Sequence, residues 1–131
     1  MIFLDTHVLA WAVAGPEKLS RAAASAIRRA RMGTGLGVAA ISLLELAVMF
    51  TRGQLRSQGS VENSIRLILE TSGVLVKPIT PAIAALATQF PDDYPRDPAD
   101  RLIGATARAE GLPLVTRDER IRSSPLLRTI W

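Results

Sequence analysis

Four acidic side chains are the residues of this sequence that could carry out chemistry together. Two of them, Asp5 and Asp118, come just after short apolar runs, and the other two, Glu45 and Asp100, follow helix start signals. Four carboxylates within about 5 Å of one another would repel by roughly 3 kcal/mol per pair at an effective dielectric constant near 20. If these side chains converge, they therefore require protonation or a bound cation.

The rest of the composition indicates which cation that would be. The chain has no cysteine and a single histidine, so an all-oxygen site would favour a hard ion, Mg²⁺ or alternatively Mn²⁺, over zinc. Such an ion can hold and polarise a phosphate and lower the pKa of the water that attacks it. With four of the 12 acidic residues assigned to this site, the 16 basic residues have an excess of eight elsewhere, which suits an RNA backbone.

Each acid also has an ordinary structural explanation. Glu45 lies three residues after Ser42, which is the spacing of a capping box at a helix start. Asp97 precedes Pro98, a helix start signal in which the aspartate is the cap, and Asp118 could begin a turn. Asp97 is thus either a further acid of the site or a helix cap, and we favour the cap.

The elements that must position these acids alternate along the chain. Apolar runs at residues 2–4, 35–40, 74–76 and 114–115 predict strands, and 127–131 is a possible edge strand. Caps, prolines and glycines predict helices after residue 5 and over 20–32, 42–53, 60–73, 80–90 and 97–111, with a short turn or helix at 118–123. This alternation predicts an α/β protein, a single domain over 1–131, with a mostly parallel sheet of four to five strands in a three-layer α/β/α arrangement. Ligands of such sheets bind at the carboxyl ends of the strands, where all four acids are expected.

Composition also limits the setting. The apolar run at 36–50 is too short for a membrane span and contains Glu45, and Asp5 interrupts any leader, so we expect no membrane segment and no secretory signal. The absence of cysteine suits a reducing compartment, and a cytoplasmic location is the expectation. Arginine supplies 14 of the 16 basic residues, which permits a nucleic-acid partner but also follows from an arginine-rich genome.

Four ordered blocks of the sequence resemble a known family. They read Leu-Asp-Thr-His-Val-Leu-Ala-Trp at 4–11, Ser-Leu-Leu-Glu-Leu-Ala at 42–47, Asp-Pro-Ala-Asp-Arg-Leu-Ile-Gly-Ala-Thr-Ala at 97–107, and Gly-Leu-Pro-Leu-Val-Thr-Arg-Asp at 111–118. With the closing Ile130-Trp131, they resemble the PIN-domain family, and in particular its VapC-type toxins. The resemblance implies a PIN-like fold, a Mg²⁺-dependent endoribonuclease, an antitoxin protein partner and a homodimer.

The resemblance also implies roles for single residues. Asp5, Glu45, Asp100 and Asp118 would form the metal-binding cluster, with Asp5 and Asp100 as its direct ligands. The hydroxyls of Thr6 and Thr116 would hold or orient these acids, and Arg101 would contact phosphate or pair with an acid. His7 is interpreted as a local structural residue. The chain departs from the common pattern at Leu44, Met49 and Pro95, where relatives often carry tryptophan, lysine and histidine.

Other interpretations remain open from the sequence. A catalytically weak RNA-binding module or a non-toxin RNA-processing enzyme fits the same residues. A phosphotransfer domain is disfavoured, because no second aspartate lies two residues after Asp5 and the third strand ends in Lys77-Pro78. The apolar helix at 43–50 has more apolar residues than one core face needs, which also favours a homodimer.

Overall fold

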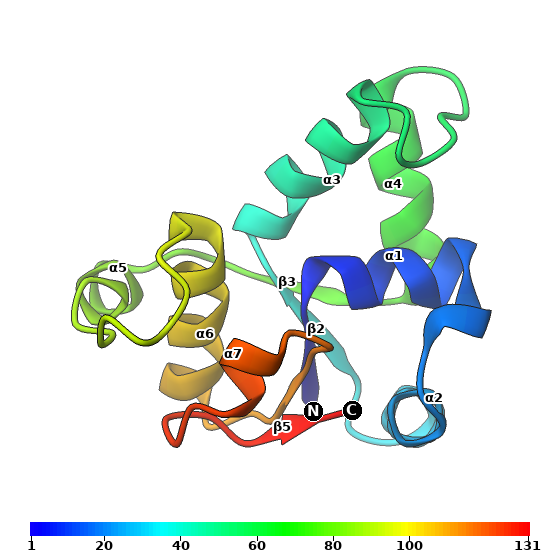
Figure 1. Cartoon of the computed structure of the whole chain (residues 1–131). Helices are drawn as coiled ribbons and strands as arrows, with labels where there is room; N and C mark the ends of the chain where they lie inside the picture. The colour runs from blue at the N-terminus through cyan, green and yellow to red at the C-terminus, as the bar shows by residue number, and fades with distance from the viewer.

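A five-stranded sheet organises the protein, whose computed structural model describes residues 1–131 (Figure 1). The strands lie in the order β3-β2-β1-β4-β5, and every neighbouring pair is parallel. The predicted sheet is therefore confirmed, with all five strands parallel and the segment at the chain end forming an edge. The strands are β1 (Ile2–Leu4), β2 (Leu36–Ala39), β3 (Leu75–Lys77), β4 (Leu114–Val115) and β5 (Thr129–Ile130).

Helices connect the strands, and most of them begin at the predicted caps. The side chains of Ser20, Ser60, Thr80 and Asp97 each accept a hydrogen bond from a backbone N–H in the first turn of the helix that follows. Glycines end several helices, as predicted. The helices are α1 (Thr6–Ala14), α2 (Arg21–Met32), α3 (Ile41–Thr51), α4 (Val61–Ser72), α5 (Pro81–Ala87), α6 (Pro98–Glu110) and α7 (Glu119–Arg122), with a 3₁₀ turn at Pro16–Lys18.

The sheet separates two hydrophobic cores, which confirms the three-layer arrangement. Side chains alternate along each strand, so Leu4 and Val115 face one core while Phe3 and Leu114 face the other. Residues of α1, α2, α3 and α4 fill the first core, and residues of α5, α6 and α7 fill the second. Figure 1 shows α5 and α6 on one side of the strands and α1 and α2 on the other.

The capping box predicted at the start of α3 is wrong. This helix begins at Ile41, the preceding Ala40 already has helical backbone angles, and no side chain caps the helix. Ser42 is instead fully buried, with its hydroxyl turned to another helix. The spacing of Ser42 and Glu45 instead brings both side chains to Thr6 of α1.

No helix of the chain is both long and apolar enough to cross a bilayer.

Helix α6 packs closely against the segment that precedes it, and Gly104 is where the two approach. A Cβ atom at this position would lie 2.8 Å from Cε2 of Phe90 and still closer to the hydroxyl of Tyr94. Both aromatic side chains are buried and meet edge to face at 4.7 Å between ring centroids, so neither can move freely. The contact fixes α6 against the loop that leads to the site.

We therefore expect Gly104→Ala to destabilise the fold by about 1 to 3 kcal/mol, because overpacking outweighs the better helix propensity of alanine. Urea unfolding followed by circular dichroism measures the change. Adding Tyr94→Phe, which removes the nearest clashing atom, should recover part of the loss. A Gly104→Ala protein as stable as the wild type would contradict the close contact.

Candidate active site

The site lies where the order of the sheet reverses direction. From β1 the chain moves outward to β2 and β3, and it later returns to place β4 and β5 on the other side of β1. The carboxyl ends of β1 and β4 therefore open into a crevice, the usual ligand position in parallel α/β sheets. Asp5 directly follows β1 and Thr116 directly follows β4, so the topology alone brings them together.

Both oxygens of Asp5 are held by hydrogen bonds. Its Oδ1 accepts from the backbone N–H of Thr6 at 2.9 Å, which makes Asp5 the N-cap of α1. Its Oδ2 accepts from the hydroxyl of Thr116 at 2.8 Å. The hydroxyl oxygen of Thr116 also accepts from the backbone N–H of Asp118 at 3.2 Å. One buried threonine therefore links the first acid to the last.

Two hydroxyl groups, those of Thr6 and Ser42, hold Glu45. The hydroxyl of Thr6 contacts Oε1 of Glu45, and it lies 2.7 Å from the hydroxyl oxygen of Ser42. Because Thr6 has one hydroxyl proton and the carboxylate cannot donate when ionised, Ser42 donates to Thr6 and Thr6 donates to Glu45. Thr6 and Ser42 are both buried. The spacing of Ser42 and Glu45 thus places both on the face of α3 that meets α1.

Asp100 and Asp97 come to the site from the start of α6. Asp97 caps this helix by accepting a hydrogen bond from the N–H of Ala99 at 2.9 Å, as we favoured from the sequence. It is also one of the residues that line the crevice, so the cap does not keep it away from the other acids. Asp100 is partly buried in the first turn, and the hydroxyl of Tyr94 lies 3.4 Å from its backbone carbonyl oxygen.

Arg101 does not form the expected pair with an acid in this structure. It pairs with no acid, and its guanidinium donates instead to the backbone carbonyl oxygens of Phe90 at 2.7 Å, Pro91 at 3.0 Å and Pro95 at 3.0 Å. These bonds close the loop in front of α6. Arg101 therefore positions the start of the helix that carries Asp100.

All four predicted acids line one crevice of about 340 Å³. Asp118 is also restrained, because its Oδ1 caps α7 by accepting from Arg120 N at 2.9 Å and its Oδ2 lies 3.5 Å from the Arg120 guanidinium. We name this crevice the acidic cleft. Its lining residues are Asp5, His7, Val8, Trp11, Glu45, Asp97, Asp100, Arg117 and Asp118.

Negative charge in the acidic cleft is poorly compensated. Burial, followed by the nearby charges of Asp5, Asp97, Glu45 and Asp118, raises the pKa of Asp100 from 3.8 to about 7. Burial also raises the pKa of Asp5 and of Glu45, against the opposing effect of their threonine hydrogen bonds. Among these acids only Asp118 forms an ion pair. The cleft is therefore electrostatically prepared for a cation.

The chemistry of the donors fits a hard divalent ion. All donors of the cluster are oxygens, and Mg²⁺ in proteins is commonly held by one or two carboxylates while water completes its shell. No group of three acidic or histidine side chains is already arranged as a ligand set. The structure therefore brings the acids to one cleft without arranging them as a complete set of metal ligands.

Sequence reasoning missed three residues of this region. The spacing of Ser42 predicts a helix cap, and Trp11 and Arg117 are not among the predicted site residues. Arg117 lies over the Trp11 ring at 5.8 Å, and the ring of His7 is also 5.8 Å from it. The available signal was helical spacing, since Trp11 lies four residues after His7 on one face of α1.

The fold and the acidic cleft define a parallel α/β protein with its site at the point where the strand order reverses. The PIN domain model matches residues 2–125. The chain is 42% identical over 132 residues to Ribonuclease VapC22 of Mycobacterium tuberculosis, covering 99% of this chain and 98% of that protein. The chain belongs to the PIN-domain family.

Solved structures share the fold at lower identity. VapBC2 of Rickettsia felis, bound to a DNA fragment from its promoter, matches with a TM-score of 0.69 and 16% identity, covering 98% of this chain and 97% of that one. A toxin-antitoxin complex from Klebsiella pneumoniae matches with a TM-score of 0.67 and 21% identity, covering 97% and 95%. These likenesses establish the fold that the sequence resemblance implied.

The raised pKa of Asp100 predicts how the metal-free protein responds to pH. The folded state binds this proton more tightly than the unfolded state does, so the contribution of Asp100 to stability is present below about pH 4 and lost as the pH rises through about 7. We expect Asp100→Asn to become increasingly more stable than the wild type over this interval, as measured by urea unfolding with EDTA present. Asp92→Asn, an exposed change outside the cleft, should show no such trend. A constant difference between Asp100→Asn and wild type across this range would contradict the electrostatic description.

Proposed function

We propose that this protein is a metal-dependent endoribonuclease and the toxin of a toxin–antitoxin pair. The observation that carries the proposal is the acidic cleft, where carboxylates that follow β1 and β4 meet carboxylates from α3 and α6, and only Asp118 has an ion-pair partner. Such a cluster is suited to a divalent ion that binds a phosphodiester. Hydrolysis would join the water oxygen to phosphorus and release the 3′ oxygen, leaving 3′-hydroxyl and 5′-phosphate ends.

Asp5 and Asp100 are proposed as the direct ligands of Mg²⁺, with Mn²⁺ as an alternative ion. Asp5 is held in place on both oxygens, and Asp100 combines partial burial with a pKa raised to about 7. Glu45 and Asp118 complete the cluster and are restrained by the hydroxyl of Thr6 and by the cap of α7. When bound, the ion would stabilise charge on the phosphate and make hydroxide available near neutral pH.

RNA as substrate and an antitoxin as partner are supported by the relatives. The protein 42% identical to this chain is named a ribonuclease, and it is matched over nearly its whole length. Two proteins with the same fold were solved as a toxin-antitoxin complex and as VapBC2. An upstream open reading frame encoding a small DNA-binding protein would support the antitoxin, and its absence would favour an RNA-processing role.

A homodimer formed through α3 is proposed as well. Leu44 and Val48 lie one turn apart on this helix, and 61% and 36% of their surfaces are exposed. Apolar side chains next to one another on a helix surface are commonly covered by a partner. Leu44→Asp should therefore shift the protein from dimer to monomer in analytical ultracentrifugation.

Removing a single proposed ligand tests the mechanism. We expect Asp5→Asn and Asp100→Asn each to lower Mg²⁺-dependent cleavage of RNA at least about a hundredfold, because the charge that holds the ion is lost while the shape is kept. Expression of either variant should no longer arrest growth. Initial rates on a fluorescent RNA and growth curves are the measurements.

Glu70→Gln is the control outside the cleft. Asp97→Asn changes a cleft acid that is not a proposed ligand; asparagine caps helices as well as aspartate does, so this variant keeps the start of α6 and should lower cleavage less than about tenfold. Glu70→Gln makes the same charge change on α4, outside the acidic cleft. Full cleavage by both ligand variants would exclude this mechanism, and a wild type that binds RNA without cleaving it would favour an RNA-binding module.

Ion binding has its own readout in the thermal stability of the protein. Mg²⁺ should stabilise the wild type by about 2.7 kcal/mol at a concentration one hundred times its dissociation constant, and EDTA should reverse this effect. Differential scanning calorimetry should show no such shift for Asp5→Asn or Asp100→Asn. An equal shift in the two variants would place the ion elsewhere.

A further inference from the structure

A second groove continues directly from the acidic cleft. It has a volume of about 410 Å³ and follows α1 away from the sheet, between this helix, the end of α3 and the α3–α4 connection. We name it the α1 groove. It shares His7 and Trp11 with the acidic cleft, and Lys18 and Arg56 line it farther along. The two hollows therefore meet at the side chains of His7 and Trp11, and together they define a path along α1.

Helix geometry sets the direction of this path. His7, Trp11 and Ala14 recur at helical spacing, so they lie on one face of α1. With a rise of 1.5 Å per residue, Trp11 lies about 6 Å along the helix from His7, and Lys18 follows beyond the helix end. A molecule anchored at the acids would thus pass Trp11 before it reached Lys18.

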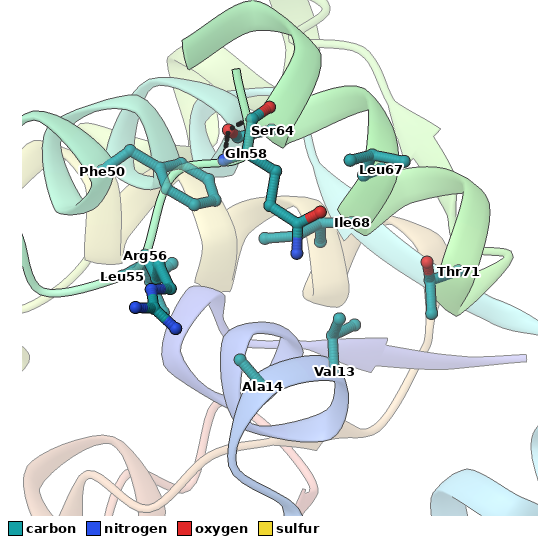
Figure 2. A pocket seen from close by; sticks show the side chains of 10 residues that line it. All are labelled: Val13, Ala14, Phe50, Leu55, Arg56, Gln58, Ser64, Leu67, Ile68 and Thr71. Atoms are coloured by element: carbon teal, nitrogen blue, oxygen red, sulfur yellow. Dashed lines mark hydrogen bonds between the residues drawn. The ribbon is translucent and has the colours of Figure 1, made fainter. Parts of the chain in front are cut away.

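Charges are segregated along the path. The acidic cleft contains five carboxylates, whereas the α1 groove is lined by no acidic residue. Lys18 and Arg56 are exposed, and neither forms an ion pair. Figure 2 shows Arg56 beside Leu55 on the α3–α4 connection, with its guanidinium directed towards α1 near Ala14. The α1 groove therefore offers two positively charged side chains without ion-pair partners, Lys18 and Arg56, beyond Trp11.

Trp11 is held by its neighbours but is not buried. Its ring lies 6.0 Å from the Trp131 ring, 5.8 Å from the His7 ring and 5.8 Å from the Arg117 guanidinium, and the residue is partly exposed and lines both hollows. Aromatic rings that accept bases, together with cations that contact the backbone, are the features by which proteins bind single-stranded nucleic acid.

We propose that the α1 groove binds the nucleotides next to the cleaved phosphate, with a base stacked on Trp11 and the adjoining phosphates on Lys18 and Arg56. This inference rests on the proposed function, because it takes RNA as the molecule anchored in the acidic cleft. It assigns substrate binding to residues outside the acid cluster. The residues that bind RNA then lie on one side of the acidic cleft instead of surrounding it.

Salt dependence tests the two cations. Fluorescence anisotropy with a labelled single-stranded RNA of about ten nucleotides, in EDTA to prevent hydrolysis, gives the association constant over a range of salt concentrations. The slope of log K against log salt is negative, and each phosphate contact on a single strand contributes about 0.7 to its magnitude. Replacing both Lys18 and Arg56 by glutamine should therefore make the slope shallower by about 1.4. Arg28→Gln with Arg31→Gln, which removes the same charge from the exposed side of α2, should leave the slope unchanged.

Base stacking is tested separately. Trp11→Leu should weaken binding of the RNA about fivefold or more, while binding of an abasic oligonucleotide of the same length should not change. Trp11→Phe should fall between wild type and Trp11→Leu. Thermal unfolding of each variant shows whether it has folded.

The outcomes separate this inference from the proposed function. An unchanged salt slope for the Lys18 and Arg56 variant, or equal loss for RNA and abasic chain in Trp11→Leu, overturns the α1 groove as an RNA subsite. Cleavage by the wild type would still support the nuclease in that case. Conversely, a reduced slope with no cleavage by the wild type would keep the groove and reject the nuclease.

Discussion

Repulsion between like charges is the constraint on which this structure depends. Five carboxylates line one cleft, and burial with mutual proximity raises the pKa of Asp100 to about 7. The protein tolerates this arrangement because several acids are held by groups that favour negative charge. Asp5 and Asp97 cap α1 and α6, where the helix dipole is positive, and buried hydroxyls donate to Asp5 and Glu45.

The same acids are therefore structural as well as chemical groups. Asp5 joins β1, α1 and the end of β4 through two hydrogen bonds. Thr6 joins α1 to α3 through Ser42 and Glu45. A site built in this way needs little support from loops, because its restraints come from the ends of strands and helices. Arg101 gives the loop before α6 a fixed shape through its bonds to backbone carbonyls.

The sequence predicted the elements well because their signals are local. Alternating apolar runs, caps and glycines located the parallel sheet, and the carboxyl-end rule then placed four acids in one region, as the structure shows. The remaining errors concern contacts between distant segments. Ser42 has the spacing of a cap, but its partner Thr6 lies 36 residues away. The roles of Arg101 and of the α1 groove depend on how two connections fold, which no local pattern indicates.

The bond between Asp5 and Thr116 spans 111 residues of sequence, and β1 lies between β2 and β4 in the sheet. A ribosome makes Asp5 well before Thr116, and proteins begin to fold from their N-terminal side while they are being synthesised. Until β4 has emerged, one side of β1 has no neighbouring strand and Asp5 has no threonine to hold it. The acidic cleft can therefore form only after the segment through Asp118 has emerged from the ribosome.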